Sequence, residues 1–238
     1  MNNQIIKLLN IDNLVFPPLQ NALDEPNGLL AFGGDLSVAR LQSAYRSGIF
    51  PWYSDGEPIM WWSPDPRGII LTDQLRINRT LRKVLKQQNF TVTLNQAFNR
   101  VINYCADAPF RKEETWIVDD MLAAYQQLHD QGIAHSIEVW MDGELAGGLY
   151  GVAINGCFSG ESMFYRKSNG SKIALVYLNN LLKHQNIPLI DCQMLNPFLE
   201  DMGCIEIPRS QYMALQATAL SVSLPSDFWL PRQLTLAP

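Results

Sequence analysis

Residues 136–164 hold the pattern that most restricts how this chain can fold. Two dipeptides, Asp142-Gly143 and Asn155-Gly156, separate the β-rich segments SIEVWM, ELAGGLYGVAI and CFSGESMF. Asp-Gly and Asn-Gly readily adopt the positive φ angles that two-residue hairpin turns require. The sequence therefore predicts an antiparallel meander of three strands.

The segments around this meander set the fold class. A helical pattern precedes the meander at Asp119 to Gln131, and a second helical pattern follows it at Ser171 to Gln185. The segment after the second helix, IPLIDCQML at residues 187–195, predicts a buried strand. Strands interleaved with helices in this order predict an α+β fold with a mixed, largely antiparallel sheet.

The N-terminal part is richer in loop signals and has shorter predicted elements. Asn27-Gly28 and Gly33-Gly34 predict loops, and Asp35 or Ser37 can cap a helix that ends before Gly48. A proline-rich aromatic segment follows, and after Arg67 the elements become longer. We predict two domains, a small N-terminal α/β domain of residues 1–67 that ends in this aromatic junction and a larger domain of residues 68–238.

Composition excludes several classes of protein. A chain of 238 residues that is 47% hydrophobic and 17% charged can bury a core and is not disordered. The segment MNNQIIKLLNIDN lacks the apolar region of a signal peptide, and no apolar run reaches the roughly 20 residues of a membrane span. We expect a cytoplasmic protein with no membrane partner. The four cysteines and three histidines show no ligand spacing, so we expect no metal site.

Residues 76–86, RINRTLRKVLK, predict an amphipathic helix. Its basic side chains fall within an arc of roughly 120° opposite the apolar face. These residues, named here the basic stripe, are Arg76, Arg79, Arg82, Lys83 and Lys86. The net charge of −5 gives no general reason to expect a nucleic-acid partner. The stripe is either a solvated helix face or a phosphate-binding surface.

Residues 48–68, GIFPWYSDGEPIMWWSPDPRG, raise a second pair of alternatives. The aromatic side chains either belong to a core or form a stacking surface that proline holds open for a flat ligand. Stiff proline-rich backbone can hold Trp52 at the domain junction as such a platform. Trp61 and Trp62 either join this platform or pack between the domains.

Candidate site residues gather on the predicted strands. Regular alternation places Asp191 and Gln193 on one face of their strand and Cys192 on the other. Neighbouring strands carry Leu149, Glu161 and Met163. The strand glycines, Gly147, Gly148, Gly151 and Gly160, would let a ligand approach the backbone. These residues line either a pocket or an ordinary core. The helix start at Gly170-Ser171 offers a weak anion-binding signal.

The order of several sequence blocks adds a resemblance that covers nearly the whole chain. EPNGLLAFGGDLS, AYRSGIFPWYSDGEPIMWWSPDPR, HSIEVW, GGLYGV, GESMF, SKIAL, LIDCQ and FWLPR closely resemble the leucyl/phenylalanyl-tRNA–protein transferases. The resemblance implies an enzyme that moves Leu or Phe, and possibly Met, from aminoacyl-tRNA to proteins beginning with Arg or Lys, creating an N-end-rule degradation signal. It also implies that the larger domain is similar to the acetyltransferase (GNAT) fold.

The same resemblance implies roles for the candidate residues. Asp191 would orient the incoming amine, Gln193 would position the amine or the ester carbonyl, and Glu161 would help to hold the substrates. Leu149, Met163 and Leu178 would form the slot for the donor side chain, although relatives carry an aromatic residue at position 178. Trp52 and Trp116 would stack on the 3′ adenosine, and the basic stripe would contact the tRNA backbone. No cofactor is needed, because the ester of the donor is already activated.

Two other functions fit parts of the same pattern. An acyl-CoA-dependent N-acetyltransferase would use a similar meander, helix and strand, and a tRNA-binding module without activity would explain the basic stripe alone. One chemical point holds for either kind of transfer. A carboxyl pKa near 3.9 lies about four pH units below the pKa of an α-amine, so an ordinary Asp191 is a poor stand-alone base.

Overall fold

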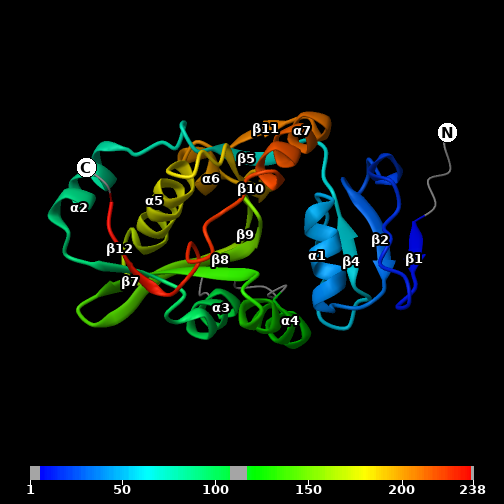
Figure 1. The fold of residues 1–238 in the computed structure, drawn as a ribbon, viewed down its shortest axis with the longest axis horizontal. Coiled ribbons are helices and arrows are strands. Elements are labelled where there is room, and N and C mark those ends of the chain that lie inside the picture. The colour runs from blue at the N-terminus through cyan, green and yellow to red at the C-terminus, as the bar shows by residue number, and fades with distance from the viewer. Residues whose placement is uncertain (1–5, 108–116, 237–238) are drawn as a thin grey trace.

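The computed structural model describes residues 6–107 and 117–236, which form a mixed α+β fold with two sheets (Figure 1). The smaller sheet has the strand order β1-β2-β4-β3. Its members are β1 (Lys7–Leu9), β2 (Leu29–Gly33), β3 (Phe50–Pro51) and β4 (Met60–Trp62). β1 runs parallel to β2, and the other pairs are antiparallel. A 3-10 helix, η1 (Leu19–Asn21), and helix α1 (Val38–Arg46) accompany this sheet.

The larger sheet has the strand order β11-β5-β10-β9-β8-β7-β6-β12. Its strands are β5 (Arg67–Leu71), β6 (Thr91–Leu94), β7 (Ala134–Met141), β8 (Glu144–Ile154), β9 (Cys157–Tyr165), β10 (Leu189–Gln193), β11 (Ile205–Ile207) and β12 (Arg232–Leu234). Only β9 and β10 pair in parallel, which confirms the mixed, largely antiparallel sheet.

Helices cover both faces of the larger sheet. They are α2 (Arg79–Gln87), α3 (Phe98–Ala106), α4 (Asp119–Asp130), α5 (Gly170–Lys183), α6 (Pro197–Asp201) and α7 (Arg209–Leu220). α3 and α4 pack on one face of β7 and β8, and α5 packs on the other (Figure 1). α1 contacts both β8 and α4, so the smaller sheet joins the larger one at this end.

The chain passes from the smaller sheet to the larger between Trp62 and Arg67. The core does not stop there, because Leu30 and Trp61 of the N-terminal part belong to the same buried cluster as Val101 and Tyr125. The division into domains 1–67 and 68–238 stays a prediction.

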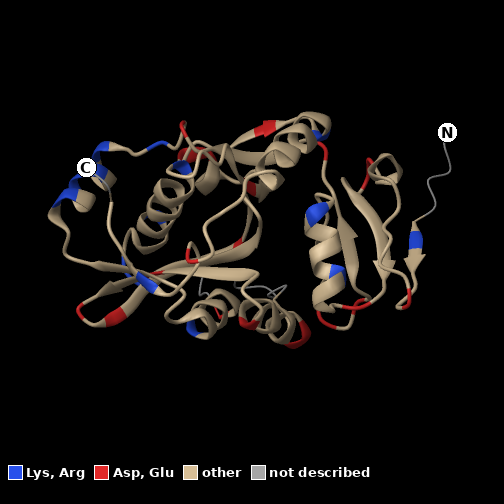
Figure 2. Cartoon of the chain, viewed as in Figure 1, with Lys and Arg blue, Asp and Glu red and all other residues tan. Residues whose placement is uncertain are grey.

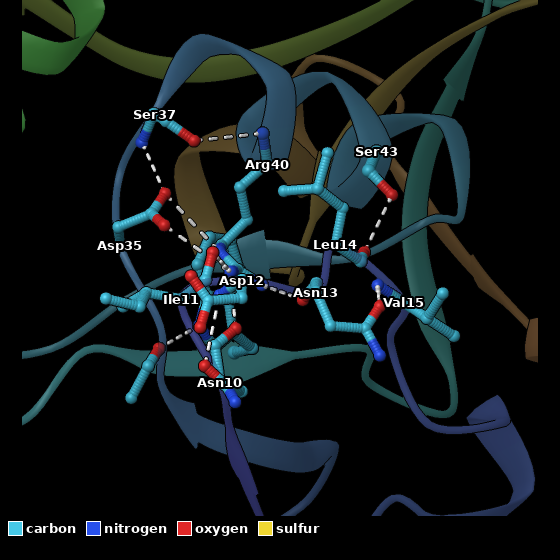
Figure 3. A network of polar contacts seen from close by, with 12 residues as sticks. Asn10, Ile11, Asp12, Asn13, Leu14, Val15, Asp35, Ser37, Arg40 and Ser43 are labelled. Atoms are coloured by element: carbon cyan, nitrogen blue, oxygen red, sulfur yellow. Dashed lines mark hydrogen bonds and ion pairs between the residues drawn. The ribbon is translucent and has the colours of Figure 1, made fainter.

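A buried arginine fixes the N-terminal segment against α1 (Figure 3). Arg40 donates through Nη2 to the carbonyl oxygen of Asn10 at 2.8 Å and through Nη1 to that of Asn13 at 3.1 Å. Its Nε lies 3.4 Å from the Asp35 carboxylate. Ser37 caps α1 by accepting from the backbone N–H of Arg40, as the sequence predicted for one of its two candidates.

Most predicted elements are present. The meander is antiparallel, and its first turn has φ angles of 54° at Asp142 and 77° at Gly143, as a hairpin turn of this type requires. One boundary was wrong. Asn78 caps α2 by accepting from the N–H of Leu81, so Arg76 lies before the helix and not on it.

Most of the strand glycines allow close packing of neighbouring backbone and do not provide space for a ligand. A Cβ at Gly147 would lie 2.5 Å from the carbonyl carbon of Gly170, and one at Gly151 would lie 2.3 Å from the carbonyl oxygen of Ser159. Gly160 alone of the four lines the cavity described below. The expectation of four ligand-facing glycines was therefore wrong for three of them.

Strands β9 and β10 separate soon after they pair. They pair only at Phe158–Ile190 and Ser159–Asp191. Beyond these pairs each strand has an irregularity, at Glu161 in β9 and at Cys192 in β10. Bulges bend a strand and leave a residue out of the ladder, so the two strands diverge and open a gap in the sheet.

Across residues 6–107 and 117–236, no helix has the length and apolar character needed to cross a membrane.

We expect Gly147→Ala to destabilise the fold by about 1–3 kcal/mol, because its Cβ would collide with backbone at the start of α5 that cannot rotate away. Gly160→Ala is the matched control, since the nearest atom to its Cβ would be the carbonyl oxygen of Asp191 at 3.7 Å. Urea unfolding of both variants measures the difference. Equal midpoints would contradict the close packing of α5 on β8.

Candidate active site

A cavity of about 690 Å³ lies where β9 and β10 diverge. Strands β8, β9 and β10 and helices α5 and α6 contribute side chains to its wall, as do Phe50 and Pro51 of β3 and the following Trp52. This volume is in the range of small-molecule sites.

Apolar side chains from three elements meet in this cavity. Leu149 from β8, Met163 from β9 and Leu178 from α5 all line it. Leu149 and Leu178 are buried, and Met163 is partly exposed. The three residues that the family resemblance implied as a slot therefore line the same cavity.

A second set of contacts surrounds Glu161, which lines the same cavity. The side-chain amide of Gln193 donates to Glu161 Oε1 at 3.0 Å, and the Tyr125 hydroxyl donates to Oε2 at 2.8 Å. The Tyr45 hydroxyl lies 2.5 Å from that of Tyr125. Burial raises the pKa of Glu161 to about 7, against the lowering effect of hydrogen bonds from Tyr45 and Tyr125. A carboxyl group with this pKa changes charge near neutral pH.

Asp191 has a different environment. Its carboxylate accepts from Arg67 Nε at 2.8 Å and Arg67 Nη2 at 2.7 Å, and from the hydroxyls of Ser159 and Tyr212, each at 2.9 Å. It also accepts from the backbone N–H of Gln193 at 3.1 Å. Burial by itself would raise the pKa of Asp191, but the Arg67 charge and these hydrogen bonds hold it below its ordinary value.

The expected pairing of Asp191 with Gln193 on one face was wrong. Gln193 has a φ of 58°, and the register with β5 shifts between these two residues, so regular alternation ends at Cys192. Ile190, Cys192 and Gln193 line the cavity, whereas Asp191 is fully buried behind it. The link between Asp191 and the cavity is the hydrogen bond that its carboxylate accepts from the backbone N–H of Gln193.

The aromatic segment divides between rim and core. Trp52 lines the cavity and is 38% exposed, with its ring against Trp62 at a centroid distance of 5.6 Å. Trp61 is fully buried and donates to the carbonyl oxygen of Gly33 at 2.9 Å. The core alternative is thus confirmed for Trp61, whereas the stacking role of Trp52 at the cavity rim stays a prediction. Trp116 lies outside the described residues.

The basic stripe is exposed at all five positions. Figure 2 shows these blue residues gathered at α2 and the segment before it. Leu81 faces the core, while Ile77, Val84 and Leu85 are partly buried. The stripe is a local concentration of positive charge on a chain whose net charge is −5.

Sequence reasoning missed five residues around the two carboxylates, namely Tyr45, Arg67, Tyr125, Ser159 and Tyr212. The only signal for Arg67 is an arginine directly before the apolar strand residues GIIL. Within the part of the chain that the structure describes, no group of three or more His, Cys, Asp or Glu side chains could hold a metal ion.

Comparisons with known proteins agree on one family. A family model described as leucyl/phenylalanyl-tRNA protein transferase matches residues 69–217, and the model of its N-terminal domain matches residues 34–65. The leucyl/phenylalanyl-tRNA–protein transferase of Colwellia psychrerythraea is 58% identical over 98% of this chain and 99% of its own. That of Pseudoalteromonas translucida is 50% identical over 98% of each chain.

Solved structures add little. The C-terminal domain of an Agrobacterium fabrum protein assigned as a lysylphosphatidylglycerol synthetase aligns with a TM-score of 0.39 at 9% identity, covering 83% of this chain and 63% of that one. This likeness is too weak to support a conclusion about the fold.

We expect Arg67→Met to destabilise the protein by about 3–5 kcal/mol, because it leaves the buried Asp191 carboxylate without its counter-charge. Asp35→Asn is the control. It removes the partner of another buried arginine, but its carboxylate is about one-third exposed, so a loss below about 1 kcal/mol is expected. Denaturant unfolding measures both variants, and similar losses would contradict a central role for the Arg67–Asp191 pair.

The Arg67–Asp191 pair also makes the stability of the fold depend on pH. Because the folded-state pKa of Asp191 lies below its unfolded value near 3.9, its contribution to stability is complete above that pH and is lost as the pH falls through the folded value.

Proposed function

The chain belongs to the leucyl/phenylalanyl-tRNA protein transferase family, and we propose that it transfers leucine or phenylalanine, with methionine as a further donor, to proteins that begin with Arg or Lys. It is an aminoacyltransferase whose substrates are aminoacyl-tRNA and protein. The new amide bond would place a bulky apolar residue at the N-terminus and so create an N-end-rule degradation signal. The observation that carries this proposal is one cavity that joins an apolar wall to the Glu161–Gln193 pair.

The apolar wall suits an unbranched or γ-branched donor side chain. Each buried methylene contributes about 0.8 kcal/mol, so leucine gains over alanine by size, but leucine and isoleucine have equal carbon counts and differ only in shape. Flexible Met163 can adapt to leucine and to phenylalanine.

The polar wall suits the acceptor amine. Gln193 has its side chain at the cavity surface next to Glu161, so it can position the amine or the ester carbonyl. Asp191 does not line the cavity and has five hydrogen-bond donors within 3.1 Å. We therefore assign Asp191 as a positioning residue that orients the amine by fixing the backbone of Gln193. Glu161 contacts the substrates directly.

The rim suits the 3′ end of the tRNA. Trp52 is the exposed aromatic residue of the N-terminal segment at the cavity, and unpaired bases bind on such aromatic faces at about 1–3 kcal/mol each. We assign Trp52 and Trp116 to the terminal adenosine. The basic stripe would then contact phosphates of the tRNA, which is a partner that an acidic chain can bind only through such a local surface.

Three broader assignments accompany this function. The divergence of two parallel strands beside a helix supports a GNAT-like larger domain, residues 68–238, joined to a small N-terminal domain, residues 1–67. The reaction needs no cofactor, since the donor ester supplies the free energy. We place it in the cytoplasm, where aminoacyl-tRNA is produced.

We expect the purified protein to add one leucine or one phenylalanine to an Arg-starting peptide when supplied with the matching aminoacyl-tRNA. Mass spectrometry of the peptide measures the added residue. A peptide with an acetylated N-terminus is the control and should stay unmodified. An unchanged peptide mass, or acetyl transfer from acetyl-CoA in its place, would reject the proposal.

The basic stripe gives a separate prediction. Arg79→Glu with Lys83→Glu should weaken tRNA binding and lower the slope of log K against log salt by about 1 for each lost phosphate contact, because fewer counterions are released. Lys7→Glu with Arg46→Glu makes the same charge change at exposed positions of β1 and α1. Filter binding across a salt series compares the two doubles. Equal slopes would show that the stripe is an ordinary solvated face.

A further inference from the structure

The cavity has one carboxylate on its wall. Among the described residues that line it, Glu161 is the only acidic one, and none is histidine or lysine. Cys192 of β10 also lines the cavity and can titrate. A hydrogen bond with Cys204, together with burial, raises the pKa of its thiol well above the ordinary value. A substrate in the cavity therefore meets a single side chain that can accept a proton near neutral pH.

The proposed reaction needs such a group. An α-amine has a pKa of about 7.7–8.0 and is mostly protonated at pH 7, and an ammonium nitrogen has no lone pair for attack on an ester. Asp191 does not line the cavity, and donors already surround its carboxylate. The proton must leave by another route.

We propose that Glu161 is a catalytic residue that accepts this proton from the α-ammonium group of the acceptor protein. The proposal rests on the function given above. The freed amine nitrogen forms a bond to the ester carbonyl carbon, and the bond from that carbon to the tRNA oxygen breaks. The second nitrogen proton passes to the departing tRNA hydroxyl, and Glu161 releases the first to solvent. Ammonium and ester thus give amide, alcohol and one proton.

The position of Glu161 fits this task. As the unpaired residue of the β9 bulge it stands beside the gap between β9 and β10, and Gln193 across this gap donates to its Oε1 at 3.0 Å. A substrate amine that contacts Gln193 would therefore be close to the carboxylate. Tyr125 holds the other oxygen from the far side, at 2.8 Å. Such fixed geometry is what proton transfer to a side chain requires.

The surroundings bring its acidity near that of the amine. The groups that act on Glu161 are Tyr45 from α1, Tyr125 from α4, Asp191 from β10 and Arg67 from β5. Burial and the Asp191 charge raise its pKa, the two tyrosines and Arg67 lower it, and the result is about 7. An ordinary glutamate, with a pKa of about 4.3, lies more than three pH units below the amine. Glu161 lies within about one.

The tyrosine pair can follow the change of charge. Tyr125 donates to the ionised carboxylate, and either hydroxyl can be the donor between Tyr45 and Tyr125. When Glu161 carries a proton on Oε2, it can donate to Tyr125, whose own hydrogen then turns to Tyr45. Both protonation states of the carboxyl group therefore keep a hydrogen bond to Tyr125.

Single-turnover transfer from phenylalanyl-tRNA to an Arg-starting peptide tests the proposal across pH 6 to 9. Glu161→Gln should lower kcat about 10²- to 10⁴-fold at pH 7 and keep the KM for the peptide within about threefold, since it removes a base and not the contact surface. Its pH profile should lose the rise near 7. Glu144→Gln removes an exposed carboxylate from β8 and should behave as the wild type.

Tyr125→Phe provides a second measurement that does not depend on how well Glu161→Gln folds. It removes a hydrogen bond that lowers the Glu161 pKa, so the rise of the rate should move to higher pH. A higher peptide KM with unchanged kcat in Glu161→Gln would overturn the proposal, as would a pH profile that neither variant alters. Transfer by the wild type in those experiments would leave the proposed function standing, whereas no transfer by the wild type would overturn both.

Discussion

The Arg67–Asp191 ion pair ties together the parts of the molecule that form the cavity. Arg67 begins β5 and Asp191 lies in the neighbouring β10, and both side chains are buried. Arg67 also donates to the carbonyl oxygen of Gly48, next to β3, and lies over the ring of Tyr212 in α7. A buried pair is favourable only when its remaining hydrogen-bonding groups are satisfied. The ring of donors from Ser159, Tyr212 and the Gln193 backbone meets this requirement.

The same requirement explains why the sheet opens at this point. Asp191 Oδ1 accepts from the N–H of Gln193 only two residues further on, and Gln193 has a positive φ. The chain therefore leaves the regular ladder directly after Asp191, and Gln193 turns toward Glu161 in the cavity. The same backbone conformation thus serves the ion pair and the cavity. It keeps the Asp191 carboxylate buried behind β10 and places the side-chain amide of Gln193 in the cavity.

Sequence patterns predicted what depends on local geometry. The turn dipeptides Asp142-Gly143 and Asn155-Gly156 predicted the meander, and strand patterns placed Leu149 and Met163 on neighbouring strands. Leu178 came only from the family resemblance, and it lines the same cavity. The patterns could not show that Arg67 meets a carboxylate 124 residues away. They also could not show that alternation fails at Cys192, because a bulge depends on hydrogen bonds made between strands. Tyr45 and Tyr125 appear in the sequence only as members of amphipathic helices.

The two carboxylates of this region illustrate how environment separates roles. Both are withdrawn from bulk water, which disfavours charge, but only Asp191 has a guanidinium group in bidentate contact. The pKa of Asp191 is lowered, so its carboxylate keeps its charge, which suits the positioning role proposed for it. Burial and the Asp191 charge raise the pKa of Glu161 to about 7, although the hydrogen bonds from Tyr45 and Tyr125 and the Arg67 charge act to lower it. Pairs whose surroundings drive their pKa values apart commonly divide fixed charge from proton transfer. By this reasoning Glu161, the carboxylate without a bidentate arginine, is the one suited to the proton transfer proposed for it.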